Sequence, residues 1–327
     1  MNFKNILKAG FILNILVSAT AYADHNHHNH LAYSGTPASV SATHLHAKGE
    51  WMASYKYMEM HMSDIMSDDS EIQPGSTDFM VEARDMQASM HMFGLMYGVS
   101  DNHTVMVMVP EVRKKMRMIN NNNGAEILMS SQGVGDVKIT NIIGLRDDLL
   151  LNLGISLPTG SIKETNAAGT RLPYGMQLGS GTYDILAGLS DIKTFGNKIF
   201  GLKVDAIFRL GRNSQDYSLG EQYKIASWFG VAHDDYNVST IGFNARHQTR
   251  IDGIDDQIEA TGAFPRVANS SGGTEFSIAL GHNHEFSKGW LEDTKFSVEY
   301  DVPVYQYVNG TQLARDYTAF FKLSKVF

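Results

Sequence analysis

Residues 295–302 read Lys-Phe-Ser-Val-Glu-Tyr-Asp-Val, so polar or charged side chains alternate with apolar ones at every step. Successive side chains of a β-strand point to opposite faces, and this segment would therefore present one charged face and one apolar face. Residues 238–247 alternate in the same way, with Ile241 and Phe243 on the face opposite Thr240 and Asn244. A two-residue period sustained over roughly ten residues predicts long strands that have one face in an apolar environment.

The same pattern divides the chain after residue 47 into twelve predicted strands. They cover residues 48–62, 85–99, 103–118, 127–145, 149–158, 181–191, 198–210, 221–231, 236–249, 273–286, 291–304 and 314–327. The connections alternate strictly between short and long. The short ones are 100–102, 146–148, 192–197, 232–235 and 287–290, and the long ones are 63–84, 119–126, 159–180, 211–220, 250–272 and 305–313. Short periplasmic turns and long extracellular loops are typical of outer-membrane barrels.

The predicted fold is therefore all-β, a transmembrane antiparallel up-and-down β-barrel of about 12 strands. Closure leaves no strand edge with unpaired backbone groups in lipid, and an even strand number places both ends of the barrel on the periplasmic side. Half of each strand would face a polar lumen, which explains a mean hydropathy of only −0.21. The rival fold is a secreted β-sandwich, but strands of globular proteins typically have only about 5–6 residues.

Two segments precede the predicted barrel of residues 48–327. Residues 1–23 have the parts of a secretory signal peptide: Lys4 and Lys8, an apolar stretch at 9–17, and Ala21-Tyr22-Ala23 as the cleavage site. Residues 24–47 are rich in His, Ser, Ala and Asn, and are predicted to form a flexible periplasmic tail. The leader and the barrel pattern together predict a protein of the cell outer membrane.

The end of the chain supports the same location. Phe327 closes a strand in which Tyr317, Phe321 and Leu323 share its face, and only Lys325 interrupts the apolar row. This resembles the C-terminal signal that the barrel-assembly machinery of outer membranes recognises. We therefore expect the barrel-assembly machinery and outer-membrane lipid as partners of a monomeric barrel.

Composition excludes several functions. The chain of 327 residues has no cysteine, which excludes a disulfide scaffold, cysteine-ligated zinc, iron–sulfur ligation and thiol catalysis. A formal charge of −8 without a basic block argues against nucleic acid as a partner. No Ser/His or Asp/His pair with catalytic spacing can be identified, so we expect no catalytic residue, no enzyme activity and no tightly bound cofactor.

Methionine is distributed unevenly. Of the 17 methionines, 15 lie between Met52 and Met129, on alternate positions of the first predicted strands. The candidate lumen-lining residues are Met58, Met60, Met62, Met90, Met92, Met106 and Met108. Three interpretations stay open: flexible packing of a narrow lumen, a passage for small hydrophobic or aromatic solutes, and handling of a soft metal such as Cu(I). All three would fail if these side chains faced the lipid.

Histidine is concentrated in the predicted tail. The candidate metal ligands are His25, His27, His28, His30, His44 and His46. Imidazole binds Cu, Zn and Ni, but a flexible tract has no fixed geometry and would bind these metals only weakly. The alternative is a solvated tail without a metal.

Several strings resemble a known family. They are Lys48-Gly49-Glu50-Trp51-Met52, Gly133-Val134-Gly135-Asp136-Val137, Leu157-Pro158-Thr159-Gly160 and Leu178-Gly179-Ser180-Gly181-Thr182-Tyr183-Asp184. Over residues 46–327 the chain is similar to the outer-membrane transporters grouped with the MetA pathway of phenol degradation. The resemblance implies a porin-like barrel channel for hydrophobic or aromatic compounds, and it implies no catalytic residues. The alternatives are a copper-binding protein that uses the tail and the methionines, and a structural barrel with a plugged lumen.

Overall fold

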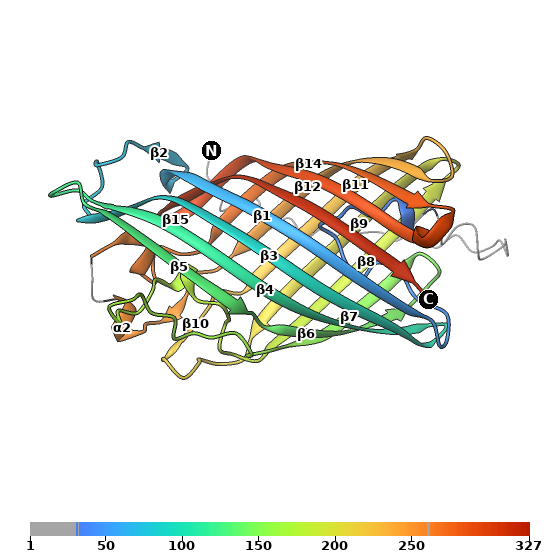
Figure 1. The fold of residues 1–327 in the computed structure, drawn as a ribbon, viewed down its shortest axis with the longest axis horizontal. Coiled ribbons are helices and arrows are strands. Elements are labelled where there is room, and N and C mark those ends of the chain that lie inside the picture. Colours follow the sequence, from blue (N-terminus) through green and yellow to red (C-terminus); the bar gives the residue numbers. More distant parts are fainter. Residues whose placement is uncertain (1–30, 32, 260–261) are drawn as a thin grey trace, which may run out of the picture.

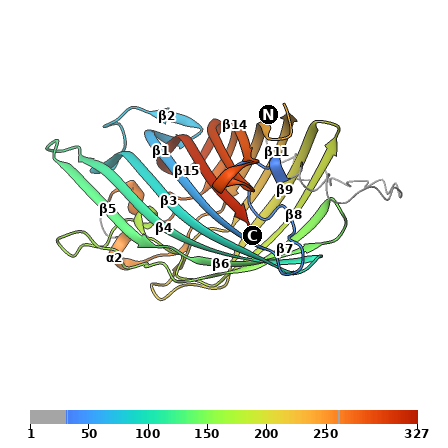
Figure 2. The ribbon, with the colours of Figure 1, turned by 45° about the vertical axis from the view of Figure 1, so that its right-hand side comes forward.

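The computed structural model describes residue 31, residues 33–259 and residues 262–327, which form a closed antiparallel β-barrel (Figure 1). Neighbouring strands of the wall are antiparallel, and β15 pairs with β1 to close the barrel (Figure 2). The wall strands are β1 (Trp51–Asp68), β3 (Val81–Ser100), β4 (His103–Asn120), β5 (Glu126–Val134), β6 (Val137–Gly144), β7 (Leu149–Leu157), β8 (Asp184–Phe195), β9 (Lys198–Arg209), β11 (Gln222–Ala232), β12 (Asn237–Gln248), β14 (Gly273–Phe286) and β15 (Thr294–Val326).

The connections contain only short elements. These are β2 (Ser70–Ile72), β10 (Tyr217–Ser218), β13 (Asp252–Gly253), the four-residue helix α2 (Asp256–Glu259) and three short 3-10 turns at Tyr174–Met176, Phe264–Arg266 and Gly289–Leu291. Within the described ranges, no helix is long and apolar enough to cross a membrane.

The register of pairing shows that β15 contains both arms of the last hairpin. It runs from Thr294, opposite the end of β14, up to Val308, and then back to Val326, which lies near the start of β1. The chain reverses beside Gly310, whose φ is +68°. The strands β5 and β6 follow one another along β4 and form one crossing. With two crossings by β15 and one by β5 and β6 together, the wall is crossed twelve times, as predicted.

The connections follow the predicted alternation in length only in part, because the five residues 121–125 at one end are fewer than the seven residues 287–293 at the other. Residues 101–102, 145–148, 196–197, 233–236 and 287–293 form short turns at the end that holds Trp51 and Val326, which we call the turn end. Residues 69–80, 158–183, 210–221 and 249–272 form long connections at the opposite loop end, where residues 121–125 form a short one. The predicted long loop at residues 305–313 is wrong, because the strand pattern continues up to a tight Asn309-Gly310 reversal.

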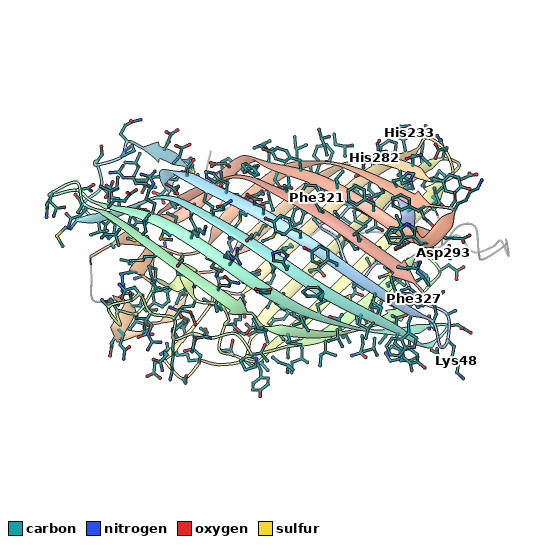
Figure 3. The ribbon with its side chains drawn as sticks, viewed as in Figure 1. Lys48, His233, His282, Asp293, Phe321 and Phe327 are labelled. Carbon is teal, nitrogen blue, oxygen red and sulfur yellow. The ribbon has the colours of Figure 1, made fainter. Side chains whose placement is uncertain are left out.

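The outer face of the barrel is apolar. Phe93, Leu153, Phe243 and Leu280 are exposed on alternate strand positions, and exposed aromatic side chains gather at the turn end, among them Trp51, Phe195, Tyr236, Trp290 and Phe327. Phe321 and Phe327 lie on this face (Figure 3). Phe327 N donates to Trp51 O at 2.8 Å, so the last residue pairs with the first strand and completes the closure. An apolar band bordered by aromatic residues is the surface that a bilayer requires.

Replacing Phe243 by arginine should destabilise the barrel in a bilayer by about 2–4 kcal/mol, the cost of a guanidinium group near the membrane midplane. Phe243 is 53% exposed and sits near the middle of β12. The free energy of unfolding from lipid vesicles measures this cost, with Phe243→Leu as the matched control. Equal stability of the arginine and leucine variants would show that this face does not meet lipid.

Candidate functional site

The strand register defines which side chains face the lumen. Lys56 of β1 points inward, because its Nζ donates to Ser39 O at 3.2 Å and to Ser41 Oγ at 3.0 Å inside the barrel. Met58, Met60 and Met62 follow Lys56 at two-residue intervals and therefore share its face. Met58, Met60 and Met62 therefore face the lumen, and Tyr55 and Tyr57, on the alternate positions, face outward.

The other predicted methionines lie on the same inner surface. Met92 is opposite Lys56, and Met90 is opposite Met58, in the pairing of β1 with β3. Met106 and Met108 of β4 lie opposite Met96 and Gly94 of β3. All seven predicted lumen-lining residues are therefore brought together on three neighbouring strands. We call this surface, with the further lumen methionines of β1, β3, β4 and β5, the methionine wall.

The methionine wall extends along the barrel. Near the turn end, Met52, Met96 and Met106 pack with Ile142 and Leu150 in one buried apolar cluster. Near the loop end, a second cluster contains Met86, Met116, Met118 and Met129. Met58, Met60, Met90 and Met92 lie between the two clusters and are only partly buried. The thioethers thus form a nearly continuous apolar strip inside the barrel.

The rest of the lumen surface carries many charged side chains. Lumen positions of β9, β11, β12, β14 and β15 carry Lys203, Asp205, Lys224, Arg246, Glu275, Glu299, Asp301, Arg315 and Lys322. Arg315 lies 2.7 Å from Glu275 Oε1 and 2.5 Å from Asp301 Oδ1. The lumen therefore has two unlike sides, one able to contact apolar groups and one able to hold water and ions.

Residues 33–47, here called the lumen segment, lie inside the barrel near the turn end (Figure 1). Lys203 Nζ donates to Ser41 O at 2.6 Å, and Glu299 accepts from Ser39 N at 2.9 Å and from Ser39 Oγ at 2.8 Å. Lys295 Nζ donates to Tyr33 O and, at 3.1 Å, to Thr36 O. Charged side chains of the lumen wall thus satisfy the backbone of the lumen segment.

Apolar contacts hold the lumen segment as well. Val40 packs with Ile199 of β9 and Trp228 of β11 in a buried cluster. A Cβ added at Gly35 would lie 2.8 Å from Ile199 Cδ1, so glycine is needed for this close approach. The lumen segment is therefore fitted to the inner surface and fills the lumen at the turn end.

This position differs from the predicted flexible tail of residues 24–47. The prediction followed from a composition rich in small polar residues, but such residues also suit a segment that crosses a narrow lumen beside charged partners. His46 is buried and His44 is half-buried, their ring centroids lie 4.9 Å apart, and His46 Nδ1 lies 2.8 Å from Glu50 Oε2. His25, His27, His28 and His30, like the predicted signal peptide of residues 1–23, lie outside the described residues.

The loop end is covered by two long connections. Leu172 and Met176 of the 158–183 connection, with Phe264 of the 249–272 connection, pack on the loop-end cluster of the methionine wall. Arg266 is buried and donates to Arg171 O at 2.6 Å, which ties the two connections together. In this conformation the lumen is thus narrowed at both ends by parts of the same chain.

The 158–183 connection also packs inside the wall at β4 and β5. Ser131 Oγ of β5 donates to Met176 O at 2.7 Å, and Lys114 Nζ of β4 donates to Gly175 O and Gln177 O at 2.9 and 2.6 Å. Ser131 and Lys114 are each two residues from a lumen methionine, Met129 and Met116, and so face the lumen. The connection therefore lies against the lumen face of β5, which among the described strands pairs only with β4.

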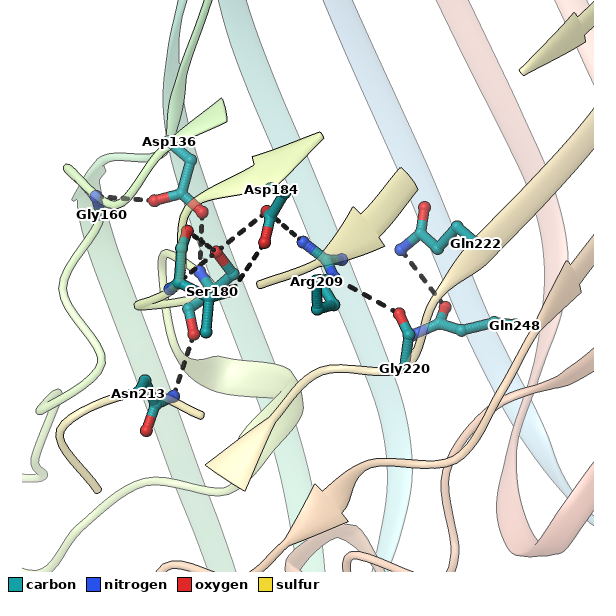
Figure 4. Close-up of polar contacts among 10 residues, drawn as sticks. Asp136, Gly160, Ser180, Asp184, Arg209, Asn213, Gly220, Gln222 and Gln248 are labelled. Carbon is teal, nitrogen blue, oxygen red and sulfur yellow. Dashed lines mark hydrogen bonds and ion pairs between the residues drawn. The ribbon is translucent and has the colours of Figure 1, made fainter. Parts of the chain in front are cut away.

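Three of the sequence strings that mark the family resemblance meet at this loop. Asp136 accepts from Gly160 N at 2.9 Å and from Ser180 N at 2.7 Å (Figure 4). Asp184 accepts from Ser180 Oγ at 3.2 Å and forms an ion pair with Arg209. Close backbone packing explains the glycines, since a Cβ added at Gly179 would lie only 2.5 Å from Gly160 O. The strings therefore form a clamp on the loop.

Replacing Asp136 by alanine should loosen the 158–183 connection by about 2–3 kcal/mol, because two backbone N–H groups lose a charged acceptor. The protection of loop amides from hydrogen exchange, or the rate at which a protease cuts the loop, measures this change. Asp147→Ala, an exposed carboxylate in a turn-end connection, is the matched control. Unchanged protection in Asp136→Ala would contradict the clamp.

Comparisons with known proteins agree with the architecture. No family model and no curated protein matches the chain. The barrel is similar to the crystal structure of an outer membrane channel from Pseudomonas putida F1, with a TM-score of 0.59 and 14% identity over 86% of this chain and 97% of that chain. A Pseudomonas aeruginosa FadL homologue has a TM-score of 0.45 and 10% identity, covering 90% and 95%, and the P. putida toluene transporter TodX has 0.43 and 8%, covering 86% and 91%. At these identities the likeness concerns the fold, an antiparallel closed barrel of the outer-membrane type.

Proposed function

We propose that this chain is a passive outer-membrane channel for small hydrophobic or aromatic compounds, closed at rest by its own lumen segment. The observation that carries the proposal is the methionine wall, an apolar strip inside a barrel whose other lumen side is charged. Flexible, polarizable thioethers contact aromatic rings favourably, by about 0.3–1.5 kcal/mol each, without a fixed shape requirement. Such a strip suits passage of varied apolar solutes better than tight binding of one.

Further features of the chain support the proposed membrane, assembly machinery, oligomeric state and transport role. The apolar outer face suits outer-membrane lipid, and the Phe327 strand suits recognition by the barrel-assembly machinery. Closure of the wall within one chain supports a monomer. The P. putida F1 channel and the TodX toluene transporter are transport proteins by their names, which supports transport rather than catalysis. The resemblance of the sequence strings to outer-membrane transporters grouped with the MetA pathway of phenol degradation agrees with the proposed solute class.

Uptake of a hydrophobic aromatic dye by intact cells tests the proposal. N-phenyl-1-naphthylamine is excluded by an intact outer membrane and fluoresces only in an apolar phase, so its signal reports entry directly. Cells that produce the full chain should take up the dye faster than cells without it, whereas entry of a charged dye of similar size should change little. Equal uptake of the aromatic dye by both kinds of cell would favour a structural barrel with a permanently plugged lumen.

A further inference from the structure

Two histidines of the lumen segment have unusual surroundings. Both ring nitrogens of His44 are buried without a hydrogen-bond partner, and so is Nε2 of His46. The two rings meet edge to face at a centroid distance of 4.9 Å. The Tyr33 ring also meets the His44 ring edge to face, at a centroid distance of 4.7 Å. Buried polar atoms are nearly always hydrogen-bonded, so three unpartnered imidazole nitrogens in one place call for a ligand.

Thioethers line a cavity next to His44. Met52, Met96 and Met106 lie directly opposite one another on β1, β3 and β4 and form one row across the methionine wall. His44 and this row line one small cavity of about 20 Å³, together with Met92, Met108, Lys56 and Lys322. A cavity of this size has room for a single water molecule or ion.

We propose that His44, His46 and the thioethers of Met52, Met96 and Met106 form a binding site for one Cu(I) ion. Thioether and imidazole are the donors that Cu(I) prefers, and the same set would accept Ag(I). The cavity lining contains no carboxylate, and the charges of Lys56 and Lys322 oppose a divalent ion more strongly than a monovalent one. Hard cations such as Mg²⁺ and Ca²⁺ are usually bound through carboxylate oxygens, which this lining lacks.

The ring nitrogens of His44 are available to a metal. Neither nitrogen has a hydrogen-bond partner. The lone pair of an imidazole nitrogen is a good donor for a soft transition-metal ion. Within the described ranges, no group of three or more His, Asp or Glu side chains could hold a metal. The proposed site has only two histidines and depends on methionine sulfur for its other metal ligands.

This site would connect the lumen segment to the barrel wall. His44 and His46 belong to the lumen segment, whereas the three methionines belong to β1, β3 and β4. An ion bound to both would hold the lumen segment in place by mass action, because it binds the closed arrangement only. Bound Cu(I) would thus keep the channel closed.

Competition of the purified full chain with a chromogenic Cu(I) chelator, in the presence of a reductant, measures binding directly and without reference to transport. We expect one Cu(I) per chain at this site, with sulfur and nitrogen neighbours in the copper X-ray absorption spectrum. His44→Phe keeps an aromatic ring at this position but removes both nitrogens. The triple variant Met52→Leu/Met96→Leu/Met106→Leu removes the thioethers. Each should weaken binding by about tenfold or more.

Two control variants separate this site from other donors. Met86→Leu/Met116→Leu/Met129→Leu changes a second row of neighbouring methionines, near the loop end, and should leave the affinity unchanged. Changing His25, His27, His28 and His30 to Asn removes the other histidines of the N-terminal region and should leave one tight Cu(I) per chain.

The proposal is overturned if Cu(I) binding is lost only in the variant of those four histidines, or if sulfur scattering is absent from the absorption spectrum. Unchanged binding in His44→Phe, with normal strand content by circular dichroism, would also overturn it. Each of these results leaves the channel proposal intact, because dye uptake is measured separately.

Discussion

Replacing Lys203 by methionine should raise the fraction of time that the barrel conducts by roughly 10–100-fold, because a hydrogen bond from a charged donor contributes about 1.5–3 kcal/mol. In the closed arrangement Lys203 Nζ donates to Ser41 O at 2.6 Å and so holds the lumen segment in place. Single-channel recording in a planar bilayer gives the open fraction. Lys198→Met makes the same substitution at an exposed position of the same strand and should leave the open fraction unchanged.

Deleting residues 24–47 should increase conduction further, because the deletion removes the whole lumen segment. Without the lumen segment, Lys56, Lys203 and Lys295 would be hydrated instead of bonded to backbone carbonyls, and the turn end of the lumen would stay open. The deletion variant should show a steady current, provided that it still unfolds on heating like an intact barrel. A folded deletion variant that conducts no better than the full chain would show that another part of the molecule closes the lumen.

Replacing Met58, Met60 and Met90 by glutamine should slow uptake of the aromatic dye by on the order of 10–100-fold, since each thioether contributes about 0.3–1.5 kcal/mol to contact with a ring. These side chains lie in the partly buried middle of the methionine wall, and Met58 and Met90 are directly opposite one another. Glutamine keeps the length of methionine but adds an amide that prefers water. The rate of dye uptake relative to a charged dye of similar size measures the effect.

The leucine variants at the same three positions are the matched control. Leucine is apolar and close to methionine in volume, so uptake of the dye should stay within a few-fold of the unchanged chain. If glutamine and leucine variants take up the aromatic dye equally well, the methionine wall serves packing alone, and solute passage does not depend on it.

The alternation of side chains predicts much of this molecule. The segments around 295–302 and 238–247 each have a polar face and an apolar face, and the structure places them in β15 and β12 with the apolar face outward. The lumen-facing position of Met58 and Met90 follows from the same parity, since a strand residue shares the face of residues two positions away. The two-residue period therefore predicts the strands and the common face of the methionines, whereas the barrel is predicted from the alternating lengths of the connections.

Other features depend on contacts between residues that are distant in the sequence. Ser39 and Ser41 occupy the lumen because Lys56, Lys203 and Glu299 satisfy their polar groups, and no local pattern indicates these partners. A segment rich in small polar residues is also typical of a flexible tail. Composition alone therefore predicts a solvated segment and not one that lies inside the barrel. The unpartnered nitrogens of His44 are likewise visible only when the lumen segment is placed against the wall.

The clamp around Asp136 could be predicted from the sequence only in part. The strings around Asp136 and Ser180 are recognisable in the sequence, and Gly181 has the positive φ of +72° that a tight re-entry into β8 needs. Their joint role is not recognisable, because the bond from Ser180 N to Asp136 spans 44 residues. Sequence therefore predicts that these residues are architectural, and the structure adds that they hold one loop against β5.

A reversible tether between the lumen segment and the wall tests the central claim most directly. A Cβ at Gly35 would lie 3.0 and 3.1 Å from Cγ1 and Cγ2 of Ile199, so Gly35→Cys/Ile199→Cys should place two Cβ atoms near the disulfide range of about 3.5–4.5 Å. The natural chain has no cysteine. Ile199→Cys alone and Gly35→Cys/Ile199→Ala, which keeps space for the new Cβ but lacks the second thiol, serve as controls. If the lumen segment closes the channel, uptake of the aromatic dye should stop in the oxidised double variant and return on reduction. Equal uptake in the oxidised and reduced states would contradict the account.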